Sequence, residues 1–141
     1  MAVTPTNLVF ILSDEHSRDS CGAYGHPLNP TPNIDRLAAS GTRFERAYTN
    51  CPICIPARAS LATGRYVHQI GYWDNAQPYD GKIASWQHRL RSQGYRIDSV
   101  GKLHFRGAPG DDHGFTQEID PLHVVESKGD VLGCIRENPP R

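Results

Sequence analysis

Residues 54–65 read Cys-Ile-Pro-Ala-Arg-Ala-Ser-Leu-Ala-Thr-Gly-Arg, and they decide more about the fold than any other stretch. The pattern predicts a thiol just before a proline-started helix over Pro56–Ala62, which Gly64 ends. Because a helix start carries unpaired backbone N–H groups, Cys54 is expected where an anion or a thiolate is favoured. Arg58 follows one helical turn later and can reach the same anion with its planar guanidinium. This stretch predicts a nucleophile that faces an oxyanion.

The composition excludes several classes of protein. The 141 residues include 15 Lys and Arg and 15 Asp and Glu, which gives a formal net charge of zero. A neutral chain lacks the field that recruits nucleic acid or an acidic membrane surface, so neither is expected as a partner. No apolar run approaches the roughly eighteen residues of a membrane-spanning helix, and no signal peptide is visible, which predicts a cytoplasmic protein. The four cysteines are too few and too irregular for a disulfide framework.

An apolar run near the N-terminus ends in a polar cluster. Asn7–Leu12 (NLVFIL) shows no alternation, which predicts a strand buried on both faces of a parallel sheet. Asp14 and Glu15 follow at its carboxyl end, where open α/β sheets bind their ligands. A carboxylate there is costly unless it is paired or metal-bound, so Asp14 is a candidate metal ligand, with a helix cap or a loop hydrogen bond as the alternative. Glu15 is either a second ligand or a solvated side chain.

Helices and strands are expected to alternate along the chain, which indicates the α/β class. Residues 107–141 are rich in loop formers and show no periodic element before Leu122–Val125. The other expected elements are a helix from Pro32 to Gly41 capped by Thr31, a short strand over Thr42–Tyr48, a helix capped by Ser85 with Trp86 and Leu90 inward that ends at Gly94, and a strand over Tyr95–Val100 followed by Gly101–His104.

Four segments in order resemble the sulfatase family. Residues 54–65 match its signature, Cys-x-Pro-x-Arg with a Leu-x-Thr-Gly-Arg tail, in full. The other matches are the strand and acidic residue of Asn7–Asp14, the Cys21–Gly25 loop with the helix Thr31–Ala38 (TPNIDRLA), and the Gly-Lys-x-His of Gly101–His104. GKLHFRG and DDHGF look most like the choline-sulfatase and phosphonate-monoesterase side of the superfamily. The resemblance implies an alkaline-phosphatase-like fold, a mostly parallel sheet flanked by helices.

The resemblance also implies the nucleophile. In sulfatases the signature cysteine, here Cys54, is converted by a formylglycine-generating enzyme to formylglycine, an aldehyde. One hydroxyl of the hydrated aldehyde attacks the sulfur of a small-molecule sulfate ester, the alcohol leaves, and the second hydroxyl then expels sulfate. Arg58 would hold the aldehyde hydrate and help to neutralise the charge on the ester oxygens.

Further site residues follow from the same resemblance. Asp14, Glu15 and residue 54 would bind a divalent metal, with calcium expected first and Mn, Mg or Zn as alternatives. Lys102 and His104 would contact the sulfate and the formylglycine hydroxyls. Since they are two residues apart, they are expected to point to the same side of a strand.

Length sets this chain apart from the family. Full-length sulfatases are several times longer and carry further metal ligands downstream, so residues 1–141 are expected to be the N-terminal portion of a catalytic domain. Alone it is expected to be inactive and to need the remainder of a sulfatase chain, or a homo-oligomer. Two alternatives stay open: a phosphonate or phosphate ester hydrolase of the same superfamily, and a non-catalytic thiol or interaction domain built on the C-x-x-C of Cys51 and Cys54.

Overall fold

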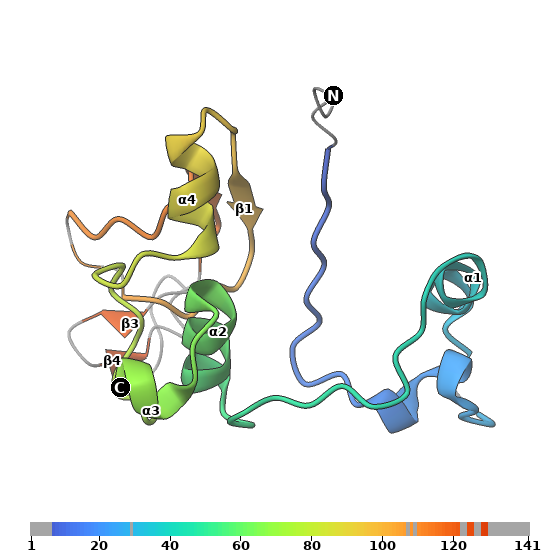
Figure 1. Ribbon diagram of the computed structural model, residues 1–141. Helices are drawn as coiled ribbons and strands as arrows, with labels where there is room; N and C mark the ends of the chain where they lie inside the picture. Colours follow the sequence, from blue (N-terminus) through green and yellow to red (C-terminus); the bar gives the residue numbers. More distant parts are fainter. Residues whose placement is uncertain are drawn as a thin grey trace, which may run out of the picture. The chain divides into compact units, whose positions relative to one another are not determined.

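The computed structural model describes residues 7–28, 30–106, 108, 110–121, 124–125 and 128–129. The chain divides into two compact units, Met1–Ala47 and Tyr48–Arg141, which we call unit 1 and unit 2 (Figure 1). No helix in these described ranges is both long and apolar enough to cross a lipid bilayer.

Unit 1 is organised around one helix and a loop. It contains the 3-10 helices η1 (Arg18–Ser20) and η2 (Gly22–Tyr24) and the helix α1 (Pro32–Ser40), which confirms the predicted helix and its end at Gly41. Thr31 occupies the N-cap position, but its side chain makes no capping hydrogen bond, so the predicted Thr31 cap is wrong. The Thr31 hydroxyl accepts a hydrogen bond from the Gly22 N–H (3.0 Å) and donates one to Asp35 Oδ1 (2.7 Å). A Cβ on Gly22 would lie 2.6 Å from that carboxylate, so a larger residue there would have to displace the Asp35 side chain.

The strands expected in and beside unit 1 do not form. Residues 7–12 have no regular structure and are exposed, Val9 by 81%. Residues 42–48 also contain no strand. A strand buried on both faces needs neighbours that pair its backbone and cover its side chains. The described part of unit 1 contains no strand that could do either, so the predictions for Asn7–Leu12 and Thr42–Tyr48 are wrong for this structure.

Unit 2 contains three helices and two small sheets among its described residues. Its elements are α2 (Cys54–Thr63), α3 (Val67–Ile70), α4 (Trp86–Ser92), β1 (Asp98–Val100), β2 (Gln117–Ile119), β3 (Val124–Val125) and β4 (Lys128–Gly129). β1 pairs in parallel with β2, Asp98 opposite Gln117 and Val100 opposite Ile119, and β3 pairs antiparallel with β4.

Several predicted boundaries in unit 2 change. α2 ends at Gly64 as predicted, with φ +69°, but it begins at Cys54, so the thiol lies inside the helix and not before it. Ser85 caps α4 as predicted, although Gln87 is buried there and Trp86 and Leu90 are only half-buried. The helix ends at Ser92, two residues before Gly94.

The strand predictions of unit 2 need similar correction. β1 is shorter than the predicted Tyr95–Val100. β2 lies inside the stretch that was expected to be loop. The sequence did not predict this strand, because its polar residues show no alternation of apolar and polar side chains. Of the Leu122–Val125 prediction, residues 122 and 123 lie outside the described residues.

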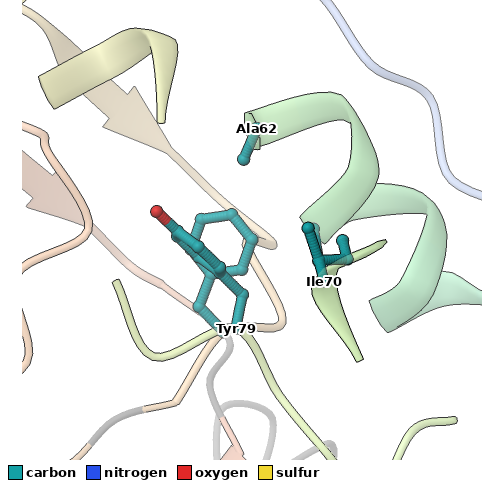
Figure 2. Packing of buried hydrophobic residues seen from close by; sticks show 5 residues of the cluster. Ala62, Ile70 and Tyr79 are labelled. Carbon is teal, nitrogen blue, oxygen red and sulfur yellow. The ribbon is translucent and has the colours of Figure 1, made fainter. Parts of the chain in front are cut away.

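The apolar core of unit 2 lies where α2, α3 and the segment after β1 meet. It consists of Ala59, Ala62, Ile70, Tyr79 and Phe105, shown as sticks in Figure 2. Tyr79 is 0% exposed, meets the Phe105 ring edge-to-face at 4.8 Å between centroids, and donates its hydroxyl to the Ile83 carbonyl (2.6 Å). Because Phe105 is part of this core, the residues just before it are held against α2.

Candidate active site

Cys54 is the first residue of α2 and is half-buried. The preceding residue, Ile53, has extended backbone angles and no side-chain group that could cap the helix. Asn75 supplies the cap from another segment: its Oδ1 accepts the Ile55 N–H at 3.0 Å. One of the unpaired N–H groups at this helix end is thereby satisfied beside the thiol.

Sequence reasoning missed Asn75. The residue lies in a turn in which Asp74 Oδ1 accepts the Ala76 N–H (2.8 Å) and Gln77 Oε1 accepts the Trp73 N–H (3.1 Å). The Asp-Asn pair is a recognisable turn signal. The turn reaches the start of α2 through the contact of Asn75 with Ile55, which are 20 residues apart. The local sequence does not encode that contact.

The loop that carries Asn75 is closed at its base by a half-buried pair, Tyr72 and Asp80. The Tyr72 hydroxyl donates to Asp80 Oδ1 at 2.8 Å, and burial together with this carboxylate raises the pKa of Tyr72. Burial acts to raise the pKa of Asp80, but hydrogen bonds from Lys82 and Tyr72 outweigh it, and the net pKa is lowered. Tyr72 is therefore a neutral donor and Asp80 an ionised acceptor at neutral pH, which fixes the loop.

Arg58 and Lys102 meet across the unit. Arg58 Nη1 donates a hydrogen bond of 2.7 Å to the Lys102 carbonyl, and both residues are half-buried. This bond joins α2, one turn beyond Cys54, to the segment that follows β1. Gly101, with φ +87°, starts that segment, and its N–H is bonded to the Ile119 carbonyl of β2 (2.9 Å). Four of the predicted site residues thus come from two directly bonded elements: Cys54 and Arg58 from α2, and Lys102 and His104 from the segment after β1.

His104 is buried in an unusual backbone conformation. It is 6% exposed and has φ +60°, in the left-handed region that non-glycine residues rarely adopt. Since β1 ends at Val100 and His104 is not extended, the prediction that Lys102 and His104 point to the same side of a strand is wrong. The conformation costs about 1–3 kcal/mol and persists because surrounding contacts hold it. Such residues are concentrated at functional sites.

The predicted metal ligands Asp14 and Glu15 lie in unit 1, whereas Cys54 belongs to unit 2. Both carboxylates are exposed, and Glu15 has φ +57°. Nowhere in the described ranges do three or more His, Cys, Asp or Glu side chains gather as a metal site would require. A hard divalent cation takes six or more oxygen ligands, and two carboxylates supply too few. The described residues therefore do not fit a complete divalent metal site, and we derive no catalytic step through a metal.

Comparison with known proteins assigns these motifs to a family. A family model described as Sulfatase matches residues 6–127. The chain belongs to the sulfatase family. It is 35% identical over 108 residues to an N-acetylglucosamine-6-O-sulfatase of Bacteroides thetaiotaomicron, which covers 76% of this chain and 19% of that protein. It is 40% identical over 88 residues to a choline-sulfatase of Rhizobium meliloti, which covers 62% and 17%.

Two solved structures show the fold of this chain. The structure of BT4656 in complex with its substrate D-glucosamine-2-N,6-O-disulfate matches with a TM-score of 0.73 and 33% identity, over 79% of this chain and 22% of that chain. Phosphonate monoester hydrolase of Agrobacterium radiobacter matches with a TM-score of 0.61 and 28% identity, over 74% and 23%. The chain has part of the alkaline-phosphatase-like sulfatase fold, a small parallel sheet with helices, and spans about a fifth of the length of these relatives.

Proposed function

We propose that this chain is the nucleophile-bearing part of a sulfuric ester hydrolase, and that Cys54 is the residue converted to formylglycine. Family membership and the complete signature in residues 54–65 support the proposal. The observation that carries it is the 2.7 Å hydrogen bond from Arg58 to the Lys102 carbonyl. That contact brings together the signature helix and the Gly-Lys-x-His segment, which are separate in sequence.

Formylglycine at position 54 would supply a hydroxyl for attack on sulfur and a second hydroxyl whose deprotonation releases sulfate. The chain's own residues have a different task, which is to bind the ester anion and spread its charge. The N-terminus of α2 favours an anion beside residue 54. Arg58 and Lys102 add two cations on the bonded elements, and each donor of this kind contributes ~3–4 kcal/mol to transition-state binding. His104, buried two residues after Lys102, holds or donates a proton at the ester or at the hydroxyls.

The proposal assigns hydrolysis to a complete sulfatase domain. This chain spans about a fifth of its relatives, and its described residues do not fit a complete metal site. We propose that the remainder of a sulfatase chain, or a second copy, supplies the further ligands of a divalent cation such as calcium. The 141-residue chain alone is then expected to hydrolyse no sulfate ester.

Conversion of Cys54 can be tested without hydrolysis. The chain is produced together with a formylglycine-generating enzyme, and a carbonyl-reactive hydrazide probe is mapped by peptide mass. Without the probe, the peptide that contains position 54 is expected to show CHO in place of CH2SH, and with the probe it is expected to carry it as a hydrazone. Cys51→Ala, the matched control, should still be labelled, whereas Cys54→Ala should not. An intact thiol at Cys54 under these conditions contradicts the proposal and favours the thiol-domain alternative.

A second candidate is a phosphonate or phosphate ester hydrolase of the same superfamily. It is favoured by the similarity to phosphonate monoester hydrolase, with a TM-score of 0.61. The converted chain, completed by the remainder of a sulfatase domain, is assayed with an aryl sulfate and with a phenyl phosphonate ester. Faster turnover of the sulfate supports the first proposal, and faster turnover of the phosphonate supports the second. Cys54→Ala should abolish either reaction.

A further inference from the structure

The segment Asp111–Phe115, with the sequence DDHGF, has no role in the proposed chemistry, yet it is tightly packed. A Cβ on Gly81 would overlap the Asp112 carbonyl oxygen, and one on Gly114 (φ +91°) would lie 2.5 Å from the His88 nitrogen. The backbone of unit 2 therefore approaches this segment closely at both glycines. Such packing leaves the segment little freedom to shift.

His113 is the residue of this segment that faces the core. It is 4% exposed, and its ring lies 5.2 Å from the Phe105 ring and 6.1 Å from the Tyr79 ring, between centroids. Its Nδ1 is 2.9 Å from Glu118 Oε1 on β2, and its carbonyl accepts a hydrogen bond from Ser85 Oγ (3.3 Å). Glu118 and Ser85 thus fix the ring and the backbone of His113 from two different elements.

Phe105 connects this cluster to the candidate active site. It follows His104 directly, and its ring contacts both Tyr79 and His113. His104 has a left-handed backbone that persists only when its surroundings hold it. A ring fixed on the far side of Phe105 limits how far the His104 backbone can relax.

We propose that His113, oriented by Glu118, is a positioning residue for His104. The inference rests on the proposed function, because that function gives His104 its place beside the ester. His113 itself contacts neither residue 54 nor substrate in this scheme. It acts through the Phe105 ring.

The alternative is that His113 only stabilises unit 2. Glu118→Leu removes the acceptor for His113 Nδ1, whereas Glu118→Gln keeps an acceptor oxygen and is the conservative rescue. Asp112→Asn is the matched control, because it weakens the ion pair with Arg91 next to His113 and leaves the Glu118 contact intact. If His113 has only a structural role, both Glu118→Leu and Asp112→Asn should lower the stability of unit 2, and neither should affect His104 specifically.

The readout is the imidazole signals of His104 in long-range ¹H–¹⁵N spectra of the 141-residue chain, assigned with His104→Gln. We expect Glu118→Leu to shift these signals, and Glu118→Gln and Asp112→Asn to leave them at their wild-type positions. The proposal is overturned if folded Glu118→Leu leaves the His104 signals unshifted, or if Asp112→Asn shifts them as far.

If Glu118→Leu does not fold, His113→Asn replaces it. This variant keeps a donor for Glu118 but loses the imidazole ring, and unshifted His104 signals again overturn the proposal. Neither Cys54 conversion nor hydrolysis enters the readout, so failure of the proposed function remains distinguishable.

Discussion

Unit 1 and unit 2 both carry sulfatase motifs, but they hold those motifs by different means. In unit 2 the residues of the candidate site rest on a core that includes Tyr79 and Phe105. Among the described residues of unit 1, Cys21 alone is both apolar and buried, and hydrogen bonds such as Thr31 to Asp35 supply the order. The difference teaches that a helix such as α1 can form from local contacts even without a side-chain cap, whereas a buried strand depends on neighbours from distant sequence.

The largest effect is expected from opening the core of unit 2. Tyr79→Ala removes a fully buried ring and its hydrogen bond to Ile83, which should lower the free energy of unfolding by ~3–5 kcal/mol. Urea unfolding followed by tryptophan fluorescence measures it, since Trp73 and Trp86 both lie in unit 2.

Tyr48→Ala is the matched control, because that tyrosine is 87% exposed and belongs to the same unit. Its cost should stay within ~0.5 kcal/mol. Equal losses for the two variants would show that the Tyr79 cluster does not stabilise unit 2.

A smaller effect is expected at the start of α2. Asn75→Ala removes the side-chain cap on the Ile55 N–H, which should cost about 1 kcal/mol. Asn75→Asp keeps an acceptor oxygen, and its charge suits a helix N-terminus, so it should retain wild-type stability. Urea midpoints of the two variants give the comparison. A loss in Asn75→Asp as large as in Asn75→Ala would mean that the hydrogen bond contributes nothing.

These effects also show how far the sequence could lead. Position-specific signals predicted α1, the end of α2 at Gly64 and the Ser85 cap of α4, because each depends on a residue whose backbone or hydroxyl preference is local. The run Asn7–Leu12 was predicted as a strand from its composition, and composition does not provide pairing partners. The α/β class was expected from the alternation of helices and strands, and the alkaline-phosphatase-like fold from the family resemblance, which the matching structures confirm.

In the candidate site, too, local features could be predicted from the sequence and long-range contacts could not. The motifs placed Arg58 on the correct helix, but Cys54 lies inside α2 and not before it. Lys102 and His104 follow β1 as expected, but they do not share one side of a strand. Asn75 was invisible to sequence reasoning because its contact with Ile55 arises only when two segments pack together. The roles of these residues in catalysis stay predictions.

A still smaller effect is expected from acid. The hydrogen bond from Arg91 lowers the pKa of Asp112 to about 2, and the pair is joined at 2.5 Å and 2.9 Å. Since the folded pKa lies below the ordinary value, the stabilisation is complete above about pH 4 and is lost as the pH falls towards 2. The Asp112 side chain is 56% exposed, so solvent screening should limit the contribution to ~1 kcal/mol or less.

This acid effect is checked by comparing wild type with Asp112→Asn by urea unfolding at about pH 5 and at about pH 2. The stability difference should be present at the higher pH and should be mostly lost at the lower one, where the pKa of Asp112, about 2, leaves the carboxyl about half protonated. A difference independent of pH would contradict the ionic origin of the contact.

The smallest effect is expected in the apolar run of unit 1. Val9→Thr changes a side chain that is 81% exposed, so the free energy of unfolding should stay within ~0.5 kcal/mol of wild type. The same substitution at Val67, which is buried in unit 2, places a hydroxyl in the interior and should cost ~1–3 kcal/mol. Urea unfolding of both variants isolates burial, because the chemical change is identical. If Val9→Thr proved as costly as Val67→Thr, the side chains of Asn7–Leu12 would have to be buried in solution. The two units would then differ in which residues bury their apolar side chains, and not in whether those side chains are buried.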